Sequence, residues 1–175
     1  MIPEIIYIII FFFLLWMVYI YNRLVIDRNR VLTAWSDIDV QLKRRHDLIP
    51  KLVDAVRQYT DFESATMQAV TALRNRSESL DNVAGISEVE QKLGDNIRRL
   101  LAVAEDYPDL KASQSFLDLQ YNLTDVENHI QYARRYYNGA VRNLNIRIES
   151  FPDMLVARLF NFMPAQFFDI DVVKT

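Results

Sequence analysis

Residues 34–53 read AWSDIDVQLKRRHDLIPKLV and bring acids, bases and a histidine close together. Such a mixture could hold a metal ion or move protons. Metal sites in helical bundles use a Glu-x-x-His spacing with further glutamates. The chain has two histidines, His46 and His129, and the residues three positions before them are Lys43 and Val126. Because the recognised ligand spacings are missing, the sequence predicts no metal site.

Nucleophilic catalysis also finds little support. The chain has no cysteine, 3 glycines and no Gly-x-Ser-x-Gly motif, so it lacks the usual means of building an oxyanion hole or a phosphate loop. Ser36 and Lys43 would lie about 10 Å apart along a helix, beyond hydrogen-bond reach. We therefore expect no catalytic and no cofactor-binding residue. A hydrolase or metal enzyme is the least favoured function.

A long amphipathic helix explains the charges of this stretch better. From Leu24 to Leu73, positions spaced alternately four and three apart are mostly apolar. Such a seam is typical of one continuous helix. Asp39 and Lys43 then form an i,i+4 pair on its solvated side. Trp35 lies on the seam, where a tryptophan is more often a core residue than a ligand clamp. Trp35 and Asp39 are candidate interaction or register residues.

Two arginines, Arg28 and Arg45, also fall on the seam. A seam arginine must pair with a carboxylate, extend its head group to water, or face another protomer. The partners expected for Arg45 are Glu127 or Asp118 on a later helix. Such a pair would fix the register of the helices more than it would add stability. Both arginines are therefore further candidate interaction or register residues.

The N-terminal segment Ile5–Tyr21, IIYIIIFFFLLWMVYIY, carries no charge. As a helix it would rise about 25 Å, at the short end of what a bilayer requires. Aromatic residues gather at its C-terminal end, as in a membrane-interface belt. A signal peptide would need a basic start and a small-residue cleavage site, and both are missing. We expect a retained transmembrane anchor over residues 1–21.

Arginines follow this segment at positions 23, 28 and 30, and neither Lys nor Arg precedes it. The positive-inside rule then places the N-terminus outside and the rest of the chain in the cytoplasm. The expected location is the cell (inner) membrane, with a single span. A net charge of −3 gives no sign of nucleic-acid binding.

The chain beyond the first helix predicts more helices. A polar loop over residues 77–86 is followed by Ser87-Glu88-Val89-Glu90, which has the spacing of a helix-capping box. The helix that starts there should end at Tyr107-Pro108, because the residue before proline disfavours helical backbone. A third helix should start between Leu110 and Ser115.

The third helix should close at Phe151-Pro152 and be followed by a short helix, Asp153 to Phe160. These apolar stripes can be buried only against one another. The expected fold is therefore all-α, a transmembrane helix and then an antiparallel bundle of three long helices and a short C-terminal helix, over residues 22–175. Helix one is longer than its partners, so it either breaks or stands partly clear. The aromatic tail, residues 161–175, either docks on the bundle or meets a partner through Phe162, Phe167 and Phe168.

Several long motifs resemble the LemA family. They are YNRLVIDRNRV, the opening stretch AWSDIDVQLKRRHDLIPKLV, LLAVAEDYPDLKAS, and ARRYYNGAVRNLNIRIESFPDMLVARLFNF. The resemblance implies a bacterial-type inner-membrane protein with one N-terminal span and a helical bundle, and it supplies no catalytic residues. The chain departs from the family pattern at Lys51, where asparagine is usual, and at Asn161, where glycine is usual.

Three functions are compatible with these features. The first is a membrane-anchored scaffold or adaptor that self-assembles or docks on membrane proteins. The resemblance suggests partners in membrane-protein quality control or envelope stress, such as a membrane protease. The second is a lipid-contacting or membrane-shaping protein that uses the basic run Lys43–Arg45. The third is the hydrolase or metal enzyme considered above.

Overall fold

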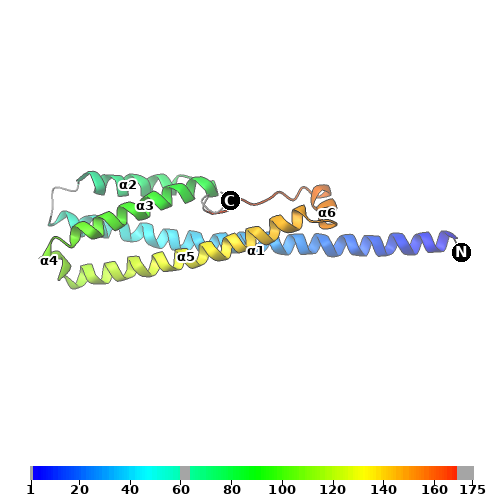
Figure 1. The fold of residues 1–175 in the computed structure, drawn as a ribbon, viewed down its shortest axis with the longest axis horizontal. Helices are drawn as coiled ribbons and strands as arrows, with labels where there is room; N and C mark the ends of the chain where they lie inside the picture. Colours follow the sequence, from blue (N-terminus) through cyan, green and yellow to red (C-terminus); the bar gives the residue numbers. More distant parts are fainter. Residues whose placement is uncertain (1, 60–63, 169–175) are drawn as a thin grey trace. The chain divides into compact units, whose positions relative to one another are not determined.

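The computed structural model describes residues 2–59 and 64–168, and every regular element in those ranges is an α-helix (Figure 1). The expected all-α fold is confirmed. The helices are α1 (Ile2–Arg57), α2 (Ser64–Glu78), α3 (Val83–Ala104), α4 (Pro108–Lys111), α5 (Gln114–Glu149) and α6 (Asp153–Leu159).

The chain divides into two compact units. Unit 1 comprises the described parts of Met1–Ser36 and Tyr136–Gln166, and unit 2 those of Asp37–Arg135 and Phe167–Thr175. Helices α1 and α5 each contribute residues to both units.

Helix α1 ends earlier than the seam predicted. The expectation of one helix continuing to Leu73 was wrong, because α1 stops at Arg57 and α2 begins at Ser64. Of the two alternatives for this over-long helix, a break is therefore the one observed. The break lets α2 pack against α3, and the seam residues Met67 and Val70 become buried in the core of unit 2. Burial of these side chains stabilises a separate α2 more than a protruding continuation would.

Helix α3 begins with a different cap from the one predicted. Its N-cap is Asn82, whose side-chain oxygen accepts a hydrogen bond from the Gly85 amide at 2.6 Å. The capping box at Ser87–Glu90 was wrong, and the predicted loop 77–86 shrinks to the residues between α2 and α3. Asparagine is among the strongest N-cap residues. Starting the helix there places Ser87 and Glu90 inside it, where both are buried.

Helix α3 ends at Ala104, three residues before the predicted Tyr107, and the short α4 was not predicted. The last two helices follow the predicted boundaries closely. Helix α5 starts at Gln114, within the expected window, and continues unbroken through Gly139 to Glu149. The short helix α6 matches the predicted C-terminal helix to one residue. In unit 2, buried side chains from four helices meet in one apolar core. They include Leu52, Val56, Val70, Leu93, Leu100 and Leu123.

In unit 1 the chain after α6 is held against α5 by hydrogen bonds between α5 side chains and its backbone. The Asn145 side chain donates to the Ala165 carbonyl at 3.0 Å and accepts from the Ala165 amide at 2.9 Å. The Tyr137 hydroxyl donates to the Gln166 carbonyl at 2.8 Å. These bonds satisfy backbone groups that have no helical partner.

The end of α6 explains the departure from the family pattern at Asn161. This residue has φ 54°, in the left-handed region. The Phe162 amide donates to the Ala157 carbonyl at 2.9 Å, and the Asn161 amide donates to the Arg158 carbonyl at 3.3 Å. This is the Schellman pattern, whose left-handed position is usually glycine and sometimes asparagine. The substitution therefore preserves the turn.

The turn predicts a graded response at position 161. Asn161→Ala should lower the free energy of unfolding by about 1 kcal/mol, because a Cβ-bearing residue without a local polar group is strained there. Asn161→Gly should be neutral or slightly stabilising. Urea unfolding of the full chain in mild detergent, followed by circular dichroism, measures both. Asn143→Ala on the exposed side of α5 is the control; equal effects of alanine at 143 and 161 would contradict the assignment.

Candidate functional site

The charged residues that drew attention in the sequence meet inside unit 2. Arg45 and His46 come from α1, Ser77 from α2, Glu90 from α3 and Glu127 from α5. These five residues are called the buried polar cluster. All except Glu127 are buried, and Glu127 is partly covered. The cluster therefore joins the four longest helices that contribute to this unit.

Arg45 forms two ion pairs. One terminal nitrogen donates to Glu90 Oε2 at 3.0 Å, and the other donates to Glu127. Two carboxylates on different helices thus neutralise one buried guanidinium, a geometry that the planar fork of arginine suits well.

The second oxygen of Glu90 is also occupied. Oε1 lies 2.6 Å from Nε2 of His46 and accepts a hydrogen bond from the Ser77 hydroxyl at 2.5 Å. The other ring nitrogen of His46, Nδ1, lies 3.6 Å from Glu78 at the end of α2. Glu90 is therefore the centre of the cluster, because it binds residues from α1 and α2 through both carboxylate oxygens.

Burial and pairing act in opposite directions on these groups. Burial alone would raise the pKa of Glu90, but hydrogen bonds from His46 and Ser77 and the charge of Arg45 outweigh it and hold the pKa below its usual value. Burial lowers the pKa of Arg45, and the charge of Glu90 opposes that effect. The cluster is stable as a set of paired charges and not as isolated ones.

The polar side chains of the cluster are occupied by one another. In the described part of the chain, no buried side-chain nitrogen or oxygen is left without a hydrogen-bond partner. No group of three or more His, Asp or Glu side chains is placed to hold a metal within residues 2–59 and 64–168. Both oxygens of Glu90 are already engaged, which leaves this carboxylate poorly placed to accept a substrate proton.

The sequence predictions for Arg45 were partly correct. The pairing with Glu127 is confirmed, whereas Asp118 instead accepts a hydrogen bond from Gln114 at 2.9 Å. Glu90, the more deeply buried partner, was missed because it had been taken for a capping residue. Its spacing carried a signal: Leu93, Gly94 and Ile97 follow it at three, four and seven positions, so it lies on the buried side of α3.

Arg28 does not lie in the core. It is exposed, and its guanidinium lies 5.5 Å from the centre of the Phe162 ring. The preceding residue, Asp27, is buried instead and accepts a hydrogen bond at 2.5 Å from Arg147, which also pairs with Asp153 at 3.1 Å. Burial tends to lower the pKa of Arg147, but these two carboxylates outweigh it and raise the pKa. This second group of paired charges, which lies in unit 1, was not predicted from the sequence.

Trp35 and Asp39 behave as helix residues. Trp35 is half-buried, and its ring centre lies 5.6 Å from that of Tyr137. Asp39 forms the expected pair with Lys43 at 2.6 Å. Arg44 lies 3.5 Å from Asp125, so each base of the run 43–45 has an acidic neighbour. These contacts weaken the idea that this run binds anionic lipid.

The three tail phenylalanines dock on the protein. Phe162 is buried in unit 1 and Phe168 in unit 2, while Phe167 is half-buried. The Arg134 guanidinium lies 5.2 Å from the centre of the Phe168 ring, a cation–π distance. Of the two roles open for the tail, docking is therefore observed as far as Phe168. The rest of the tail, residues 169–175, lies outside the described residues.

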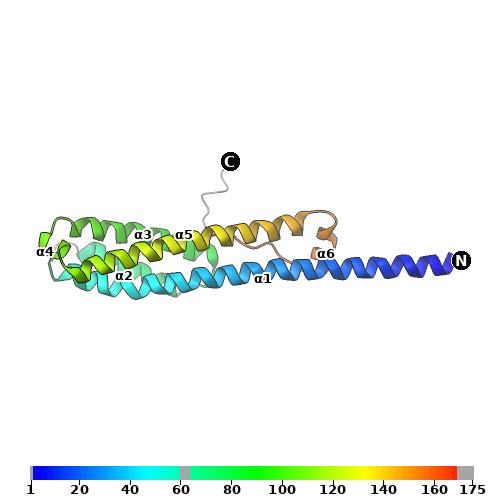
Figure 2. The same ribbon diagram turned by 90° about the horizontal axis from the view of Figure 1, so that it is seen from below.

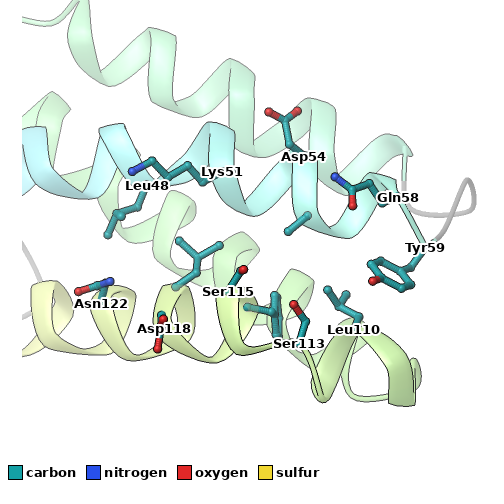
Figure 3. A pocket seen from close by; sticks show the side chains of 13 residues that line it. Leu48, Lys51, Asp54, Gln58, Tyr59, Leu110, Ser113, Ser115, Asp118 and Asn122 are labelled. Atoms are coloured by element: carbon teal, nitrogen blue, oxygen red, sulfur yellow. The ribbon is translucent and has the colours of Figure 1, made fainter.

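Unit 2 has a large groove away from the cluster, about 650 Å³ in volume (Figure 3). Leu48 and Lys51 line it from α1, Tyr59 from the turn after α1, and Asp118 and Asn122 from α5. Its lining mixes apolar, acidic, basic and amide side chains, and neither histidine is among them. The groove shares no residue with the buried polar cluster.

The cluster predicts a strong asymmetry between two adjacent arginines. Arg45→Met should lower the free energy of unfolding by about 3–5 kcal/mol, because it leaves two carboxylates without their shared cation. Arg44→Met, which removes an exposed pair, should cost less than about 1 kcal/mol. Thermal and urea unfolding of the full chain in mild detergent gives both values. Similar losses for the two variants would show that Arg45 does not carry the cluster.

Acid should also destabilise the protein through Glu90. Its pKa is lower in the folded chain than in the unfolded chain, so its ionisation favours folding. That contribution is complete above the ordinary value of 4.5 and is lost as the pH falls through the folded-state pKa. Glu90→Gln should therefore be less stable near neutral pH and show a shallower loss of stability in acid. Unfolding measured over this range checks it, with exposed Glu149→Gln as control; an unchanged acid slope in Glu90→Gln would refute the prediction.

Comparison with known proteins agrees with the motifs. The model of the LemA family matches residues 34–175. Protein LemA of Metamycoplasma hominis is 31% identical over 155 residues, covering 87% of this chain and 70% of that protein. Magnetosome protein MamQ 2 of Paramagnetospirillum magneticum is 22% identical over 174 residues, covering 85% of this chain and 64% of its own length. Magnetosome protein MamQ of Magnetospirillum gryphiswaldense is 21% identical over the same length. The chain thus spans a little less than two thirds of the MamQ proteins. With the family model matching most of its length, the chain belongs to the LemA family.

Proposed function

We propose that this protein is a single-pass, membrane-anchored helical scaffold that self-assembles or docks on membrane proteins. One observation carries the membrane anchor. In α1, every side chain from Ile5 to Leu15 is large and apolar, and each is between 47% and 71% exposed. An exposed apolar surface of this length is unstable in water and stable in lipid. An 18-residue window in the helix has a mean hydropathy of 2.3 and is 6% buried, so length and composition are compatible with a membrane span.

The flanking charges support one orientation. Arg23, Arg28 and Arg30 follow the apolar run and are exposed. Positive residues are retained on the cytoplasmic side, so the proposal places the N-terminus outside and the helical units in the cytoplasm. In a bacterial-type cell this location is the inner membrane. The similarity to relatives named as magnetosome proteins supports a membrane-associated role.

The scaffold part of the proposal rests on what unit 2 offers to other molecules. Its polar interior is closed by internal pairs, as described above, whereas large side chains on α5 point outward. Tyr121 and Tyr132 are exposed, and so is Leu117 one turn before Tyr121. Tyrosine is enriched at protein–protein interfaces, where it adds contact area and a hydrogen bond. We assign these residues to contacts with a second copy or with a membrane protein.

Two measurements test the proposal. Reporter fusions at each end of the chain should place the N-terminus outside and the C-terminus inside. Crosslinking in native membranes, followed by sizing in mild detergent, should give an oligomer or a stable complex, which Tyr121→Ser with Tyr132→Ser should weaken. The control is Asn122→Ser, an exposed neighbour on α5. A protein that remains monomeric over micromolar concentrations, without a crosslinked partner, would disprove the scaffold role.

A further inference from the structure

Helix α6 is apolar on more than one side. Val156 and Ala157 are buried within unit 1. Leu155 and Leu159, one turn apart on another side, are 53% and 66% exposed. Phe151 and Met163, which flank the helix, are each 77% exposed. Part of the apolar surface of α6 is therefore left uncovered by the described residues.

The same helix lies beside the end of the apolar run of α1. The ring of Phe160 lies 4.8 Å from that of Tyr21, and the ring of Phe162 lies 5.8 Å from it. Tyr21 is the last residue of the uncharged run. Both ribbon views place α6 next to α1 (Figures 1 and 2). The exposed apolar surface of α6 is therefore close to the point where the apolar surface of α1 ends.

Three exposed arginines lie on α1 and α6 in this region of unit 1. Arg23 and Arg28 follow Tyr21 on α1, Arg158 lies on α6, and all three are exposed. The guanidinium of Arg23 lies 5.7 Å from the ring of Tyr19, and that of Arg28 lies over Phe162. Apolar side chains next to arginines and aromatic rings are the composition of elements that lie in the lipid headgroup layer.

We propose that α6, with Phe151 and Met163, is a second membrane contact that rests in the interfacial layer of the bilayer. This contact depends on the anchor described under the proposed function. The structure favours lipid as the partner of this surface, because the apolar surface continues from α1. The arginines beside it carry the positive charge that binds anionic headgroups. Helix α6 has 7 residues, too few to cross a bilayer, so it lies along the surface.

Tryptophan quenching by brominated lipid tests this contact in the full chain. The two native tryptophans are useful reporters, because Trp16 lies within the apolar run and Trp35 lies about 21 Å beyond Tyr21 along α1. Three single-tryptophan proteins are needed: Trp35→Phe retains Trp16, Trp16→Phe retains Trp35, and the double variant with Leu155→Trp reports on α6. Each is reconstituted in vesicles of phosphatidylcholine and phosphatidylglycerol, brominated near the headgroup end of the acyl chains or not.

The expected result is a loss of fluorescence for tryptophan at 155 comparable with that for Trp16, and little loss for Trp35. Leu159→Trp in place of Leu155→Trp should behave in the same way, and circular dichroism checks that each variant is folded. If Trp16 is quenched and neither α6 reporter is, the interfacial contact is disproved while the anchor stands. A second copy covering α6 would give that same result. If Trp16 is not quenched, the anchor itself is disproved and the contact with it.

Discussion

A buried guanidinium cannot be left without a counter-charge, and unit 2 is organised around this constraint. Arg45 on α1 can be neutralised only if α3 presents Glu90 and α5 presents Glu127 at the same level. A slide of either helix by one turn would move its carboxylate about 5.4 Å and leave a charge unpaired in the interior. The apolar core would tolerate several alignments of the helices, whereas the ion pairs permit one. Arg45 therefore selects among packings that hydrophobic burial alone does not distinguish.

Glu90 extends the same constraint to the helix after the break in α1. Its second oxygen binds His46 of α1 and Ser77 near the end of α2. This bond adds to the apolar side chains Met67 and Val70 and to the pair of Glu78 with His46, which also hold α2. The N-cap at Asn82 complements the arrangement, because it sets where α3 starts and thus which of its side chains face inward. A local backbone preference and a long-range charge pair specify the same register, which is the consistency expected of a well-defined fold.

The sequence was sufficient for the all-α fold and for the position of Arg45 on an apolar side, since both follow from short-range periodicity. It was not sufficient to choose between two local signals that look alike. Asn82 and Ser87 are both good N-caps with a helix pattern after them, and only the partners of Glu90 on other helices decide between them. The sequence between α1 and α2 contains neither glycine nor proline. The signal that it offered for a break was a polar residue at each of two successive seam positions, Glu63 and Thr66. The seam spacing placed Arg28 on the apolar side, whereas the buried residue is its neighbour Asp27. The spacing could not show this, because Asp27 is paired with Arg147, which is distant in the sequence.

The length of the uncharged run in α1 has a consequence for where such a protein is stable. Residues 5–21 rise about 25 Å as a helix, while the hydrocarbon core of a typical bilayer is about 30 Å thick. In a thick membrane, this hydrophobic mismatch requires the lipid to thin around the helix, at a cost that grows with each ångström. A run of this length therefore favours a thin bilayer. Adding apolar residues to the run would shift that preference between membranes of different thickness without altering a single contact in the helical units.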